Sequence, residues 1–212
     1  MTSIWGPLGW MTLHSISANY PEQPSESDKL ILKRYLSLFI ETITCPTCKG
    51  HFGSMYNSYV VRFPRWADSR ADLFLFVCRA HNTVNMRLDK HRLPSVSECV
   101  TALRYAARVT DPATYRAQYH NYLQRNWARE PTADGFIMSR SVREMMKINA
   151  EYWCLRETGF GDLSFPEADV LQPIIPTRGS TGLPIPGVSP ATGAPISVGF
   201  KMRGGKFSLI GR

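Results

Sequence analysis

The sequence lacks the features of a membrane-spanning or a secreted protein. No stretch approaches the roughly 18 uninterrupted apolar residues that a membrane span needs. The first residues show no basic segment followed by an apolar one, so we expect no signal peptide. The 5 cysteines are too few for a secreted scaffold held by many disulfides. We therefore expect a cytoplasmic or other intracellular protein, in which a disulfide would be uncommon and functionally meaningful.

The sequence also lacks long blocks of like charge and any internal repeat. Its formal net charge is +8, and such a basic balance can indicate binding to nucleic acid or to membrane headgroups. Because the charges are scattered, a solvated basic surface is the simpler interpretation, with a nucleic-acid interface as the alternative. The apolar content of 43% indicates a folded globular protein.

Apolar residues recur at helical spacing, and no long segment alternates with a period of two. This pattern predicts an all-α bundle. Ser25 with Asp28, and Ser141 with Glu144, each have the spacing of a capping box that would open a helix. The expected helices cover residues 7–20, 25–43, a segment opening at Pro46, 68–89, 95–107, 112–127 and 141–159.

The composition changes abruptly from Gln172 onward. This last stretch is rich in proline and glycine, and it carries basic residues but no acidic one. It cannot bury a core alone, so we expect an extended arm or a disordered tail over residues 172–212.

Two cysteines separated by two residues, Cys45-Pro46-Thr47-Cys48, follow a predicted helix and open the next one. The positive end of a helix dipole and its unpaired amide groups stabilise a thiolate. Two cysteines at this spacing can also close a small disulfide ring, and Pro46 restricts the backbone between them. The pair is therefore a candidate redox dithiol, although the preceding helix differs from the strand of a thioredoxin-like protein.

Two alternatives to the redox interpretation remain open. Cys45 and Cys48 could bind zinc together with Cys78 and His81, or with His51, because two pairs of ligands suit a tetrahedral site. Both cysteines could instead be small buried side chains without a chemical role.

Three motifs occur along the chain in a fixed order. They are Trp5-Gly6-Pro7 with Trp10-Met11-Thr12-Leu13-His14, then Cys45-Pro46-Thr47-Cys48, then Cys78-x-x-His81-Asn82-x-Val84-Asn85 continuing to Lys90. Over roughly residues 5–105 the sequence resembles the Erv/ALR-type FAD-linked sulfhydryl oxidases, including versions encoded by large DNA viruses. The resemblance implies a helical bundle that binds FAD. This bundle would consist of a four-helix core and a short fifth helix. Residues 1–108 would form this oxidase domain, 109–171 an additional helical region, and 172–212 the tail.

The resemblance also implies roles for individual residues. Cys45 would exchange disulfides with protein thiols, and Cys48 would be the thiol next to the flavin, which passes electrons to dioxygen and yields hydrogen peroxide. The residues expected to contact FAD are Trp5, Trp10, His14, Tyr20, Cys48, His81, Asn82, Asn85 and Lys90. A structural disulfide would join Cys78 to Cys99, and no metal is expected.

Cys154 has no counterpart in the resemblance, and we expect a buried thiol, with an intermolecular disulfide as the alternative. No second C-x-x-C pair is present to relay electrons. Substrate thiols would therefore reach Cys45 directly or through a thioredoxin-like protein. The resemblance further implies a homodimer, and a viral setting would let the C-terminal arm contact capsid or other virion proteins. Two other functions remain as alternatives, a zinc-stabilised helical binding module and a structural virion protein with an inactive oxidase core.

Overall fold

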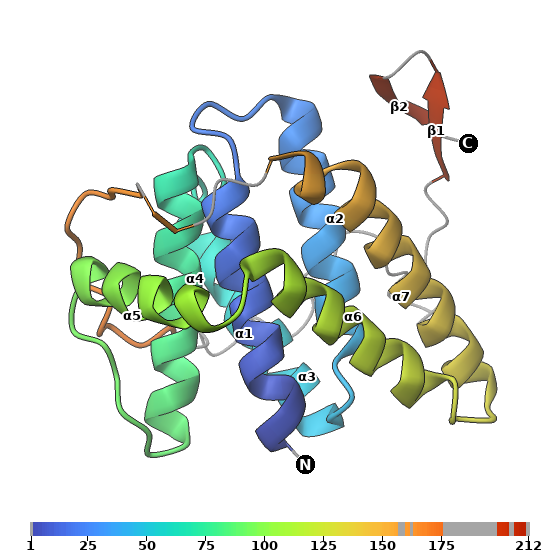
Figure 1. Cartoon of the computed structure of the whole chain (residues 1–212), viewed down its shortest axis with the longest axis horizontal. Coiled ribbons are helices and arrows are strands. Elements are labelled where there is room, and N and C mark those ends of the chain that lie inside the picture. Colours follow the sequence, from blue (N-terminus) through green and yellow to red (C-terminus); the bar gives the residue numbers. More distant parts are fainter. Residues whose placement is uncertain (1, 157–159, 162, 176–198, 204–205, 211–212) are drawn as a thin grey trace.

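The computed structural model describes residues 2–156, 160–161, 163–175, 199–203 and 206–210. Over these residues the prediction of a helical protein is confirmed (Figure 1). The helices are α1 (Thr2–Asn19), α2 (Glu26–Thr42), α3 (Pro46–Arg62), α4 (Arg70–Arg87), α5 (Val96–Val109), α6 (Pro112–Trp127), α7 (Ala133–Glu151) and a 3₁₀ turn η1 (Trp153–Arg156). None of the helices in the described part is both long and apolar enough to cross a membrane.

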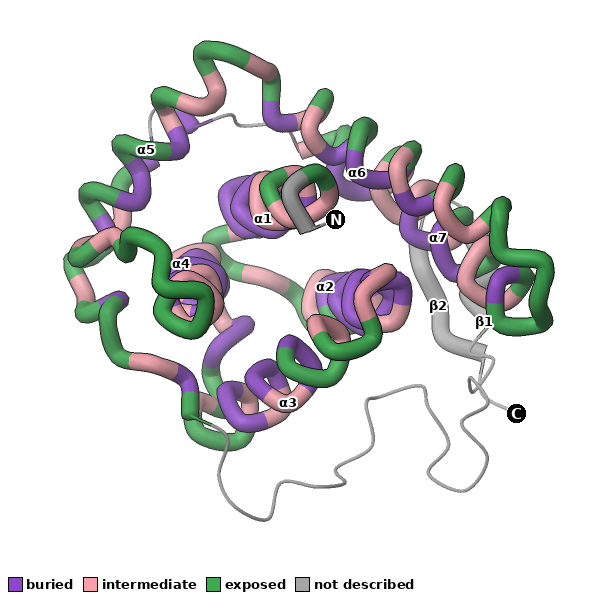
Figure 2. Tube along the Cα trace, turned by 90° about the horizontal axis from the view of Figure 1, so that it is seen from below, coloured by how far each residue is buried: buried purple, intermediate pink, exposed green. Residues whose placement is uncertain are grey.

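The first four helices form a bundle that is seen nearly end-on in Figure 2, with their buried faces turned toward one another. Helices α5, α6 and α7 follow one another along one side of this bundle. The main core contains Leu13 from α1, Leu36 from α2, Tyr56 from α3 and Phe76 from α4. The expected four-helix core with a further helix beside it is thus present.

Local capping explains most helix starts. Ser25 and Asp28 form the predicted capping box at the start of α2. The predicted box at Ser141 and Glu144 is wrong, because both residues lie inside α7. That helix begins at Ala133, where the side chain of Thr132 accepts a hydrogen bond from the Gly135 amide. Likewise, α1 begins at Thr2 and contains Pro7 rather than starting at it.

Helices α6 and α7, which we call the α6–α7 hairpin, do not fold around a core of their own. Tyr119 of α6 and Met145 of α7 belong to the same buried cluster as the residues of α1 and α2. Arg34 of α2 forms a bidentate ion pair with Glu144 of α7. The predicted additional region therefore completes the bundle.

Residues 160–161 and 163–175, which we call the C-terminal strap, cross the outer side of α4 and α5 (orange in Figure 1). Arg104 of α5 donates hydrogen bonds to two strap carbonyls. Phe165 stacks on Phe74 of α4, with ring centroids 4.1 Å apart. Ile174 is buried and its amide donates to the Thr83 hydroxyl at 3.0 Å. Ordered packing therefore continues past the predicted boundary at Gln172.

The tail also contains regular structure that the sequence did not predict. Strands β1 (Gly199–Arg203) and β2 (Lys206–Ile210) pair antiparallel, with Gly199 opposite Ile210. Residues 176–198 of the expected arm lie outside the described part of the chain.

Candidate redox site

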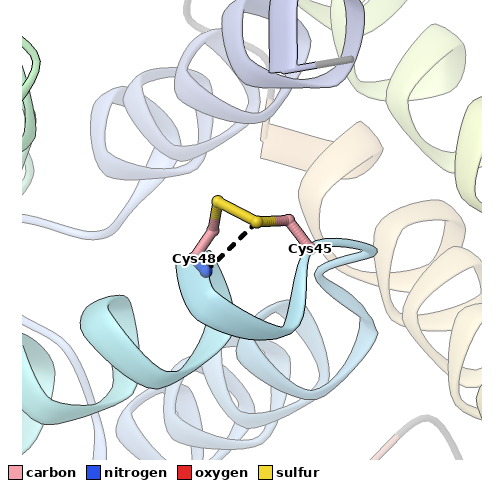
Figure 3. Close-up of a disulfide and its surroundings, with 2 residues drawn as sticks. All are labelled: Cys45 and Cys48. Atoms are coloured by element: carbon pink, nitrogen blue, oxygen red, sulfur yellow. Dashed lines mark hydrogen bonds between the residues drawn. A yellow bond between two sulfur atoms is a disulfide. The ribbon is translucent and has the colours of Figure 1, made fainter.

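Cys45 and Cys48 are joined by a disulfide at the start of α3, with their Cα atoms 5.2 Å apart (Figure 3). Cys45 is the N-cap residue of α3, and its sulfur accepts a hydrogen bond from the Cys48 amide at 3.2 Å. Pro46 occupies the first helical position, where a missing N–H is tolerated. Helix start and disulfide ring therefore share the same four residues, as the sequence predicts.

The surroundings of this disulfide favour a thiolate once the bond is reduced. The first turn of α3 contains no acidic residue that would oppose a negative sulfur. The helix dipole and the free amides of that turn are positive at the position of Cys45. Both cysteines are partly exposed, so a thiol from outside can approach.

An aromatic cluster joins α1, α3 and α4, and its member on α3 lies one turn after Cys48. Phe52 follows Cys48 by one turn of α3, and its ring centroid is 5.9 Å from that of Trp10 on α1. Trp10 in turn stacks on His81 of α4, with centroids 4.3 Å apart and planes 10° from parallel. The ring contacts thus connect the helix that carries the cysteine pair to α1 and α4.

His14 joins this cluster through His81, and both histidine rings are uncharged at neutral pH. His14 Nε2 lies 3.1 Å from His81 Nδ1, within hydrogen-bond distance. Burial lowers the pKa of His14 well below its usual value, and the nearby His81 lowers it further. Burial, with a smaller effect of the Lys90 charge, lowers the pKa of His81 to about 4. Both rings are therefore neutral at pH 7, and His14 Nδ1 is buried without a hydrogen-bond partner among the described residues.

Two other predicted contacts are Trp5 on α1 and Tyr20, which follows the end of that helix. Tyr20 is fully buried beyond the end of α1, and its hydroxyl donates to the Ala67 carbonyl at 3.0 Å. Burial raises the pKa of Tyr20, so it remains a neutral donor. Trp5 is half-buried against the main core near the start of the helix. The structure therefore brings together Trp10, His14 and His81, whereas Tyr20 is held by its hydrogen bond to Ala67.

The two predicted asparagines on α4 hold neighbouring backbone. Asn82 is buried, its amide nitrogen donates to the carbonyls of Leu93 and Val170, and its oxygen accepts from the Leu93 amide. Asn85 donates to the His91 carbonyl at 2.9 Å. The predicted role of Asn82 as a cofactor contact thus competes with a structural one. Lys90 is exposed just after α4.

The remaining cysteines differ in part from expectation. Cys78 and Cys99 are both buried and hydrogen-bond to each other, but they are free thiols. Their predicted disulfide is not formed in this structure, although their contact is compatible with it. Burial raises the pKa of Cys78, so it stays protonated. Cys154 is exposed rather than buried, and its sulfur accepts from the Asn149 amide group at 3.3 Å.

The zinc alternative finds no support in the geometry. The sulfurs of Cys45 and Cys48 are bonded to each other. Among the residues that the structure describes, no group of three or more His, Cys, Asp or Glu side chains could hold a metal ion.

Two residues near the disulfide escaped prediction. Phe52 could have been found, because its position one helical turn after Cys48 puts it on the same face. Trp127 of α6 donates its indole N–H to the Thr42 carbonyl, just before Cys45. No local sequence pattern predicts this hydrogen bond, because Trp127 and Thr42 are far apart in the sequence.

Comparison with known proteins identifies relatives of the helical core. The Erv1/Alr family matches residues 8–106. The mitochondrial FAD-linked sulfhydryl oxidase ERV1 of Saccharomyces cerevisiae is 34% identical over 85 residues, which are 40% of this chain and 43% of that protein. The FAD-linked sulfhydryl oxidase ERV1 of Arabidopsis thaliana is 32% identical over 89 residues, 42% of this chain and 44% of that protein.

A viral relative is matched over a larger share of its length. The FAD-linked sulfhydryl oxidase of African swine fever virus (isolate Tick/Malawi/Lil 20-1/1983) is 30% identical over 86 residues, 41% of this chain and 69% of that protein. By contrast, the chain spans less than half the length of the yeast and Arabidopsis relatives. No solved structure matches the chain significantly.

Proposed function

The chain belongs to the Erv1/Alr family, and from that premise we propose that it is an FAD-dependent thiol oxidase. It forms disulfides in protein substrates, with electrons passing from Cys45 and Cys48 through FAD to dioxygen to give hydrogen peroxide. The single observation that carries this proposal is the Cys45–Cys48 disulfide at the partly exposed start of α3. The names of the matched relatives support both the activity and the cofactor.

The aromatic cluster fits a flavin. Trp10 and His81 offer flat faces that can stack on an aromatic ring system. His14 Nδ1 is buried and has no hydrogen-bond partner among the residues that the structure describes, and a polar edge of the cofactor would satisfy it. We propose that Trp10, His14 and His81 hold FAD, with Trp5, Tyr20, Cys48, Asn82, Asn85 and Lys90 as the further contacts that the resemblance predicts. When bound, FAD accepts an electron pair and delivers it to oxygen, which no side chain can do.

The thiol chemistry belongs to the chain's own residues. A substrate thiolate attacks the Cys45 sulfur, the Cys45–Cys48 bond breaks, and Cys48 leaves as a thiolate. A second substrate thiolate attacks the substrate sulfur of the mixed disulfide and releases Cys45. The substrate has then lost two electrons, the cysteine pair has gained them, and both cysteines have the positive start of α3 beside them. Reoxidation of the pair through FAD consumes one dioxygen and two protons and forms one hydrogen peroxide.

The substrates in this proposal are protein dithiols, which reach Cys45 directly or through a thioredoxin-like protein. The sequence carries no second C-x-x-C pair that would relay electrons within the chain. A homodimer follows from the resemblance to the family, and contacts of residues 172–212 with capsid or virion proteins follow from the resemblance to its viral members. The match to a viral relative supports this setting.

Replacing Cys48 by serine tests the proposal. The purified protein should carry bound FAD and consume oxygen when a dithiol is added. C48S should keep the flavin absorbance, because one sulfur contributes little to binding, but lose turnover to below about 1% of the unchanged protein, since the pair can no longer form. Cys154→Ser is the matched control and should retain full activity. Oxygen consumption that survives in C48S, or a protein that binds no FAD, contradicts the proposal.

A further inference from the structure

The turn of the α6–α7 hairpin is anchored next to the redox disulfide. Trp127, the last residue of α6, is half-buried, and its indole N–H donates to the Thr42 carbonyl at 3.0 Å. Thr42 is the last residue of α2 and is fully buried. Cys45 follows Thr42 by three residues. Trp127 lies outside residues 8–106, the part that matches the family.

This hydrogen bond acts on the segment that places Cys45. The last carbonyl groups of a helix have no partner within the helix, and at Thr42 the indole supplies one. Only Ile43 and Thr44 separate Thr42 from Cys45, and Ile43 is itself buried, with its amide bonded to the Ile40 carbonyl. So short a linker leaves Cys45 little freedom once its upstream end is held.

The same hairpin supports the redox helix at a second point. Tyr119 of α6 packs on Phe39 of α2, with ring centroids 5.2 Å apart. Phe39 lies 5.7 Å from Phe52, one turn after Cys48. At Gly9 of α1, an added Cβ would lie 3.3 Å from the Tyr119 ring, so α6 packs closely against the bundle here. The hairpin thus supports α3 indirectly through ring packing, and it also holds the end of α2 through Trp127.

We propose that Trp127 is a positioning residue for the redox pair. It holds the end of α2 so that Cys45 stays at the N-cap of α3, where its sulfur meets that of Cys48. The role in turnover rests on the proposed oxidase function, whereas the effect on the disulfide itself does not. Without the indole N–H, Cys45 leaves the N-cap more often, and the effective concentration of one thiol at the other falls.

Two substitutions of tryptophan by phenylalanine separate this role from general stability. W127F keeps an aromatic ring and removes the donor to Thr42. W153F is the matched control, because Trp153 is fully buried in the η1 turn that follows α7, yet its indole nitrogen has no hydrogen-bond partner in the described part of the chain. Both variants lose packing, so both should lower the thermal midpoint, but only W127F removes a bond near Cys45.

The primary measurement is the equilibrium of the Cys45–Cys48 pair with glutathione under anaerobic conditions, followed by alkylation and mass spectrometry. W127F should shift this equilibrium toward the dithiol by about three- to tenfold, the worth of one neutral hydrogen bond. W153F should stay within about twofold of the unchanged protein on the same reasoning. In oxygen-consumption assays W127F should lower kcat and leave KM for a small dithiol unchanged.

An unshifted equilibrium in W127F, or an equal shift in W153F, overturns the positioning role. If W127F does not fold, 3-benzothienylalanine at position 127 keeps the indole shape without the N–H, and the same shift is expected. Because this equilibrium needs neither flavin nor oxygen, it still decides the role of Trp127 if the unchanged protein shows no oxidase activity. That last result would contradict the proposed function alone.

Discussion

At the scale of single residues, burial decides which side chains carry charge. His120 of α6 lies inside the core and hydrogen-bonds the Tyr35 hydroxyl at 2.9 Å. Burial, and to a lesser degree the charge of Arg116, lowers the pKa of His120 to about 3. In the aromatic cluster, burial likewise lowers the pKa of His14 and His81 and keeps both rings neutral. A folded protein with several neutral buried histidines should lose stability in acid.

His120 offers a direct test of that expectation. In the unfolded chain its pKa is near 6.5, so between pH 6.5 and about 3 the unfolded state binds a proton that the folded state does not. Stability is therefore full above pH 6.5 and falls as the pH drops. Acidification from pH 7 to 5 should cost about 2 kcal/mol through this residue. Urea unfolding at both pH values should show a correspondingly smaller loss in H120Q, and an equal loss would contradict the assignment.

At the scale of elements, one residue of α4 ties together three segments. Asn82 bonds the loop before α5 through Leu93 and the C-terminal strap through Val170. Asn82, which the sequence motif predicted to contact the cofactor, therefore also connects these backbone segments. Its neighbour Asn85 makes a single bond to the His91 carbonyl at a less buried position.

Replacing each asparagine by alanine distinguishes the two roles. N82A removes the side-chain partner of the buried Val170 carbonyl and of the part-buried Leu93 carbonyl and amide, and it should lower the free energy of unfolding by about 3 kcal/mol. It should also make the strap more sensitive to protease. N85A should cost less than about 1 kcal/mol. Flavin loss in N82A without any change in the stability of the flavin-free protein would show instead that Asn82 acts mainly on the cofactor.

At the scale of the whole molecule, a single core extends beyond the part that matches the family. Tyr35 of α2 contacts His120 and Trp153, which both lie after residue 106. Tyr152 adds a hydrogen bond from its hydroxyl to Asp28. The C-terminal strap closes the other side of the bundle over α4 and α5. The helices that match the family thus share their core with the unmatched half of the chain.

Truncations test this dependence. Ending the chain after Ile175 should preserve folding, flavin binding and turnover, because the packed strap remains complete. Ending it at residue 108 should yield an unstable or aggregating protein, since the apolar faces of α1 and α2 would be exposed to water. Solubility and thermal unfolding measure both outcomes. A stable, flavin-binding fragment of residues 1–108 would contradict the shared core.

The sequence alone was sufficient for several features that depend on neighbouring residues. Helical periodicity predicted the bundle, and Ser25 with Asp28 correctly marked the start of α2, because capping depends on residues only three apart. The C-x-x-C spacing likewise predicted a disulfide ring at a helix start. Ser141 and Glu144 have the same capping pattern but lie inside α7, where Glu144 pairs instead with Arg34. A local pattern does not reveal which competing partner is available.

The tertiary structure decided what depends on residues distant in sequence. Only the packed structure shows that Trp10 stacks on His81, that Asn82 holds the strap, and that Trp127 donates to the Thr42 carbonyl. Those contacts arise because helices far apart along the chain must bury their apolar faces against one another. The Cys45–Cys48 disulfide was therefore predictable from four consecutive residues, whereas its surroundings exist only in the assembled bundle.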